Sequence, residues 1–135
     1  MRKVICFICC LFVCTVATAC TAEKLKTEKL RDIEFTVLAK EDVPKEFIQE
    51  IEKREKKPFK LTFEDQGYMY IAEGYGKQAT SGYSIEIAEL YESENAIYVR
   101  TDLIGPGENE DIVMRPTYPF VVVKLENIEK NVVFR

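Results

Sequence analysis

The sequence contains no histidine and no tryptophan, and its five cysteines all lie within the first 20 residues. Without imidazole, the chain cannot build a Ser-His-Asp triad, a Cys-His dyad or most catalytic zinc centres. Beyond Cys20 it has no thiol for a disulfide, a nucleophile or a metal ligand. These absences exclude most familiar enzyme classes, so we expect no catalytic residue, no metal site and no cofactor.

The size and charge of the chain further limit the functions that it could have. The chain has 135 residues, 47% of them apolar, and carries 19 Lys and Arg against 23 Asp and Glu, a net charge of −4. This size and composition are typical of one globular domain. The negative sign argues against nucleic acid as a partner and against docking on anionic lipid by charge alone.

The N-terminus has the pattern of an export signal. Arg2 and Lys3 precede an apolar run at residues 4–16 and a small-residue site at residues 17–19. The run is shorter than the roughly 20 residues that a membrane span needs. Residues 16–20 (VATAC) resemble the lipobox of bacterial lipoproteins, which implies lipidation of Cys20 and a membrane-anchored protein that faces outside the cytoplasm. Ordinary signal-peptide cleavage after residue 19 is the alternative.

The remaining chain divides into a tether and one domain. Residues 21–32 are highly charged and lack a strand pattern, which indicates a solvated tether after the signal peptide of residues 1–20. The domain at residues 33–135 opens with alternating apolar residues at 33–39, which predict a strand. Asp42 as N-cap and Pro44 then begin one amphipathic helix, which ends before Pro58.

Short strands dominate the rest of the domain. Alternating patterns predict hairpins at residues 59–72 and 84–103. A more continuously apolar run predicts a central strand at 120–125, and a short last strand is expected at 132–134. About seven strands and one helix predict an α+β fold of mostly antiparallel β structure, either a β-sandwich or a strongly twisted sheet.

A glycine-rich loop between the two hairpins is the main functional candidate. Residues 73–83 hold three of the six glycines. Glycine permits positive φ and close backbone approach, and small hydroxyls at a loop tip suit a partner-binding protrusion. The predicted contacts are Gly76, Lys77, Thr80, Ser81, Gly82 and Tyr83. A plain connection without a partner is the alternative; a phosphate loop is excluded because a strand, not a helix, follows.

A family resemblance covers this loop and the strands around it. Residues 68–72 (YMYIA), 76–77 (GK), 80–87 (TSGYSIEI) and 117–124 (TYPFVVVK) resemble the C-terminal domain of PrcB-type protease-complex subunits. The resemblance spans about residues 68–125 and implies an exported, noncatalytic lipoprotein that assists or stabilises a subtilisin-like extracellular protease. The family usually has Pro and Gly around the Thr, where this chain has Ala79 and Ser81.

A second resemblance indicates a different class of protease as the partner. Thr80, Gly82 and Tyr83 are similar to the Asn-Pro-Thr-Thr-Gly-Tyr/Phe loop of chagasin-type cysteine-protease inhibitors, which are immunoglobulin-like sandwiches. It implies a loop that plugs an active-site cleft, supported by Arg115 and Tyr118 from a neighbouring loop. Both resemblances imply a protease as partner. The third hypothesis is a surface lipoprotein with an unrelated binding role.

An acidic, turn-rich segment at residues 105–111 (GPGENED) precedes Arg115. Its carboxylates could bind calcium, but their spacing matches no calcium loop, and a solvated turn is the simpler expectation.

Lipidation of Cys20 gives the first testable prediction. The Cys20→Ser variant should move from the membrane fraction to the soluble fraction, because serine cannot carry the thioether-linked lipid. Fractionation followed by immunoblotting measures the shift. Membrane retention equal to that of the wild type would contradict the prediction.

Overall fold

The computed structural model describes residues 28–135. The predicted signal peptide, the predicted lipidation site Cys20 and residues 21–27 of the predicted tether lie outside the described residues. Within residues 28–135, no helix has the length and hydrophobicity that crossing a membrane would require.

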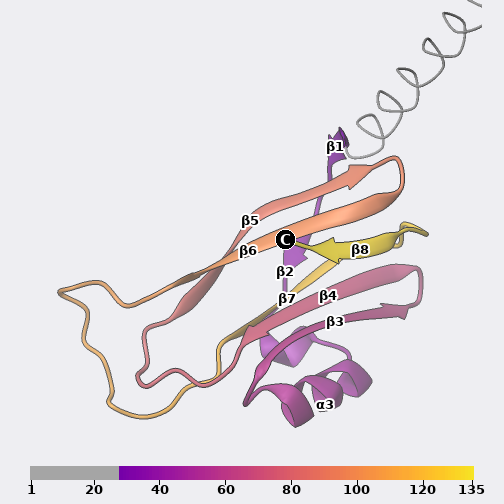
Figure 1. Cartoon of the computed structure of the whole chain (residues 1–135). Coiled ribbons are helices and arrows are strands. Elements are labelled where there is room, and N and C mark those ends of the chain that lie inside the picture. The colour runs from indigo at the N-terminus through magenta and orange to yellow at the C-terminus, as the bar shows by residue number, and fades with distance from the viewer. Residues whose placement is uncertain (1–27) are drawn as a thin grey trace, which may run out of the picture.

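Two four-stranded sheets and one α-helix form the described chain. In chain order the elements are β1 (Lys29–Asp32), β2 (Thr36–Val37), the 3-10 helix η1 (Lys40–Asp42), α3 (Lys45–Arg54), β3 (Pro58–Asp65), β4 (Tyr68–Tyr75), β5 (Ser84–Ser93), β6 (Ala96–Ile104), β7 (Phe120–Glu126) and β8 (Asn131–Phe134). The strand orders are β1-β5-β6-β8 and β2-β7-β4-β3 (Figure 1). All neighbours are antiparallel except β6 and β8. The predicted mostly antiparallel β structure with one α-helix is confirmed, with eight strands instead of about seven.

The start of the domain differs from the prediction. The chain pairs with β5 through β1 and then with β7 through β2, so it crosses from one sheet to the other within residues 33–35. Ile33 is buried, whereas Phe35 and Val37 are 38% and 56% exposed. The single strand predicted at residues 33–39 is therefore wrong, because the apolar alternation belongs to a crossing segment that buries only its first member.

The two sheets share one apolar core. Strand alternation turns Ile71 and Val123 of one sheet and Ile97 and Val99 of the other into the same cluster, and each is at most 2% exposed. Burying an aliphatic side chain of this size contributes about 1.5–3 kcal/mol. The buried members of the cluster are Ile33, Met69, Ile71, Leu90, Ile97, Val99, Val121, Val123 and Leu125.

A second apolar cluster lies between the helix and the other face of the β2-β7-β4-β3 sheet (Figure 1). Phe47 of α3 stacks on Phe63 with 5.2 Å between the ring centroids. The predicted amphipathic helix is confirmed, but its N-cap is Pro44 and not Asp42, which ends η1. The residue before a proline avoids the helical region, and Val43 is accordingly extended at φ −75° and ψ 135°.

Both predicted hairpins are confirmed, as β3–β4 and β5–β6. The first turns at Gln66 and Gly67, whose φ values of 52° and 81° match the type I′ geometry that favours tight hairpins. In the second hairpin, the Ser93 hydroxyl accepts a hydrogen bond from the Ala96 N–H and donates one to the Ala96 carbonyl, both at 3.1 Å.

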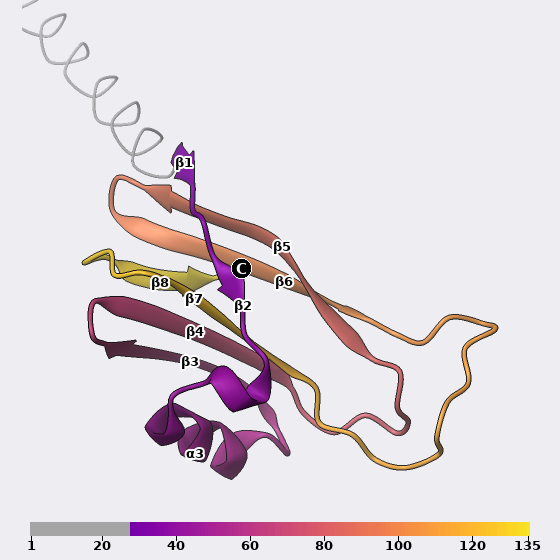
Figure 2. The ribbon, with the colours of Figure 1, turned by 180° about the vertical axis from the view of Figure 1, so that it is seen from behind.

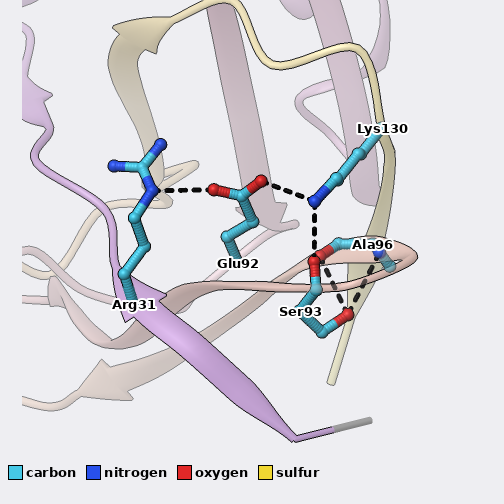
Figure 3. Close-up of polar contacts among 5 residues, drawn as sticks. All are labelled: Arg31, Glu92, Ser93, Ala96 and Lys130. Carbon is cyan, nitrogen blue, oxygen red and sulfur yellow. Dashed lines mark hydrogen bonds and ion pairs between the residues drawn. The ribbon is translucent and has the colours of Figure 1, made fainter. Parts of the chain in front are cut away.

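The Glu92 carboxylate, beside this second turn, connects three segments of the chain through hydrogen bonds (Figure 3). Glu92 of β5 accepts hydrogen bonds from Arg31 of β1 at 2.7 Å and from Lys130 of the β7–β8 turn at 2.6 Å. Lys130 also donates to the Ser93 carbonyl at 2.9 Å. The hydrogen bonds from Lys130 and Arg31 lower the pKa of the Glu92 carboxyl. Residues 29–32, assigned to the tether from sequence, are held on the sheet by this contact.

We expect Glu92→Gln to lower the free energy of unfolding by about 1 kcal/mol at pH 7. Because the pKa of Glu92 is lowered in the folded state, its stabilising contribution is complete above the unfolded value of about 4.3 and is lost as the pH falls through the lowered pKa. Urea unfolding at pH 7 and pH 3 should show the difference from wild type shrinking at the lower pH.

Glu94→Gln is the matched control, since Glu94 is exposed in the same turn. It should leave stability nearly unchanged at both pH values. If Glu92→Gln lowers the free energy of unfolding equally at pH 7 and pH 3, the stabilisation does not depend on the charge of Glu92.

Candidate functional site

Two long loops meet at one end of the molecule. The glycine loop (residues 76–83) joins β4 to β5, and the β6–β7 loop (residues 105–119) joins β6 to β7 (Figures 1 and 2). The described chain begins at the opposite end, where Lys29 pairs with Ser93. The ten residues of β5 separate the two ends by about 30 Å.

A β-bridge joins the loops near their base. The Gln78 N–H donates to the Thr117 carbonyl at 2.8 Å, and the Thr117 N–H donates back to the Gln78 carbonyl at 3.0 Å. The Thr117 hydroxyl also donates to the Thr80 carbonyl at 2.7 Å. These bonds continue the pairing of β4 and β7 into the loops, so the two connections form one protrusion.

Ser81 joins the loops a second time, farther from the sheets. Its N–H donates to the Val113 carbonyl at 3.1 Å, and its hydroxyl accepts from the Val113 N–H at 2.8 Å. The Thr80 hydroxyl donates to the Ser81 carbonyl at 3.0 Å. Both hydroxyls that the sequence placed at a contact tip therefore make hydrogen bonds within the protrusion, which they stiffen.

The two glycines of the glycine loop have positive φ, 72° at Gly76 and 92° at Gly82. At Gly82 the backbone approaches the β6–β7 loop closely, because a Cβ there would lie 2.8 Å from Cβ of Pro106 and 3.4 Å from Cγ2 of Ile112. Real Cβ contacts are rarely so short. Gly82 thus permits the two loops to pack together.

The other predicted site residues gather on the same protrusion. Lys77 and Arg115 are exposed, one on each loop, while Tyr83 and Tyr118 are half-buried. The structure therefore brings Arg115 and Tyr118 close to the glycine loop through the bonded pairs at Gln78 and Ser81. Their role in binding a partner stays a prediction.

Sequence reasoning missed the most exposed apolar residues of this end. Ile112, Val113 and Met114 are 41%, 54% and 79% exposed, and Ile104 at the end of β6 is 44% exposed. The sequence feature that could have identified them is the apolar triplet between the acidic segment and Arg115. We define residues 112–114 as the apolar tip.

The acidic segment forms a turn beside the apolar tip. The Glu110 carboxylate accepts from the Gly107 N–H at 3.0 Å, and the Glu110 N–H donates to the Gly107 carbonyl at 3.1 Å. Over residues 28–135, the structure contains no group of three or more acidic side chains that could hold a metal ion.

Glu73 lies where the shared core meets the loops. It is only 8% exposed, and its Oε2 atom has no hydrogen-bond partner among the described residues. Burial raises the pKa of this carboxyl, opposed by the Thr101 hydroxyl and by the charge of Lys60. Thr101 also hydrogen-bonds the Tyr75 hydroxyl, which links the two sheets just below the protrusion.

The loop pairing leads to a prediction at Gly82. Gly82→Ala should raise the amide hydrogen-exchange rates of Ser81 and Val113 by roughly tenfold, because strain at positive φ of about 1–3 kcal/mol and the contact with Pro106 favour separated loops. Exchange measured by NMR or mass spectrometry checks this.

Gly67→Ala is the control, because Gly67 has a similar φ of 81° but nothing within 4 Å of an added Cβ. It should weaken the β3–β4 hairpin and leave the exchange of Ser81 and Val113 unchanged. The same exchange in Gly82→Ala as in wild type would show that Gly82 is not needed for loop packing.

Comparison with known families places this site inside a recognised domain. Residues 69–126 match the family described as PrcB C-terminal. The match runs from β4 to β7 and includes both loops. No curated protein and no solved structure matches the chain. This match confirms the resemblance to the PrcB family that the sequence predicted over about residues 68–125.

Proposed function

We propose that the protein is an exported, lipid-anchored, noncatalytic subunit that binds an extracellular protease and stabilises or assists it. The observation that carries the proposal is the pairing of the glycine loop with the β6–β7 loop inside the family-matched segment. A protrusion whose backbone is already ordered loses little conformational entropy on binding. This suits a protein that acts by docking.

The positions of the two ends support this role. The described chain begins beside Ser93, about 30 Å along β5 from the paired loops. If Cys20 is lipidated, the anchor leads to the end remote from the loops. The protrusion would then point away from the membrane, where a secreted or surface protease can reach it.

The chemistry of the paired loops supports binding over catalysis. The hydroxyls of Thr80, Ser81 and Thr117 all make hydrogen bonds within the protrusion. The nearest carboxyl with a raised pKa, Glu73, is buried between the sheets. A nucleophile needs both an activating base and access to substrate. Neither the loop hydroxyls nor the Glu73 carboxyl has both.

Capture from native cells tests the proposal. The protein, produced in its own cells with an affinity tag after Arg135, should co-purify with a protease identified by mass spectrometry. Gly82→Ala should reduce the capture several-fold because it separates the loops, and Gly67→Ala should not. Purification without any protease would overturn the proposal in favour of an unrelated binding role.

The activity of the captured protease decides the direction of the effect. Retained activity with a longer half-life supports the assisting subunit. Loss of activity that returns when the protein is removed would overturn that role and favour the inhibitor implied by the chagasin-like residues Thr80, Gly82 and Tyr83.

A further inference from the structure

We infer that the apolar tip, residues 112–114, is the part of the protrusion that enters the partner, and that the glycine loop serves as its support. The partner surface would be an apolar depression bordered by basic side chains. The inference rests on the proposed function and names the contact residues, which the sequence had placed on the glycine loop.

Exposure singles out the apolar tip. Ile112, Val113 and Met114 are consecutive in the chain, and all three are exposed. Leu30 of β1 and Val133 of β8, which are also exposed, lie on separate strands. Isolated exposed apolar residues are ordinary, whereas a contiguous group marks an interaction site.

The apolar tip is also held in place. Both the N–H and the carbonyl of Val113 bond Ser81, and the Arg115 N–H donates to the same carbonyl at 2.9 Å. Ile112 lies against the backbone of Gly82. Covering these exposed apolar side chains with a partner would remove apolar area from water, and a backbone that is already fixed loses less entropy on binding. The flexible Met114 side chain can adapt to the partner.

Charge indicates what borders the partner's depression. Glu108, Glu110 and Asp111 are exposed directly before the apolar tip, and Arg115 follows it. An excess of carboxylates favours a partner surface with basic residues around an apolar centre. It disfavours insertion into a membrane with anionic lipids, which would repel these carboxylates.

Photo-crosslinking in native cells tests the inference. The photoreactive residue p-benzoylphenylalanine replaces Met114, Lys77 on the glycine loop, or Leu30 at the opposite end. We expect an adduct from position 114, with the crosslinked peptide mapping to an apolar depression with basic neighbours, and none from position 30. An adduct from position 77 alone, adducts with lipid, or no adduct from position 114 would overturn the inference.

The identity of the adduct separates this inference from the proposed function. A protease crosslinked only through position 77 leaves the proposed function standing and overturns the role of the apolar tip. A partner crosslinked at position 114 that has the expected surface but no protease activity supports the tip and overturns the proposed function.

Affinity for the identified partner gives the quantitative test. Met114→Ser should weaken binding about tenfold or more, because it removes the most exposed apolar side chain without touching the loop hydrogen bonds. Leu30→Ser is the matched control and should leave affinity unchanged. Both variants should keep the wild-type unfolding midpoint. Equal affinity of Met114→Ser and wild type would overturn the inference.

Discussion

The pairing of β4 with β7 is the constraint on which the rest of the structure depends. Seven consecutive residue pairs, from Tyr68 with Glu126 to Gly74 with Phe120, fix the register. Because side chains alternate across a strand, this register sends Val121 and Val123 into the core between the sheets and Val122 toward the helix. A shift of one residue would exchange the two faces, so that side chains packed in one cluster would face the other.

The same register positions the candidate site. The Tyr75 N–H donates to the Pro119 carbonyl beyond the last strand pair, and the bridge between Gln78 and Thr117 follows. The glycine loop and the β6–β7 loop leave the sheet together and stay bonded as far as Ser81 and Val113. The protrusion is therefore an extension of the central strand pair, which explains how Ser81 and Val113, 32 positions apart in sequence, can belong to one surface.

Local pattern predicted the helix, both hairpins and the central strand, since each depends on residues close in the chain. It failed at residues 33–39, where Ile33 contributes to the core between two sheets that the sequence does not distinguish. For the site, Gly76 and Gly82 adopt the positive φ that glycine was expected to permit in this loop. The use of the Ser81 hydroxyl within the fold and the exposure of Met114 could not be predicted, because both depend on which loop lies opposite.

The sequence by itself determined the chemistry that the chain lacks, the family that residues 69–126 match and the apolar alternation that builds the strands. These are properties of residue type and spacing. Only the tertiary structure decided that Glu92 ties β1 to the β7–β8 turn and that Gly82 packs beneath the apolar tip. Such contacts join segments tens of residues apart, and strand register, which is set by core packing, decides which of them meet.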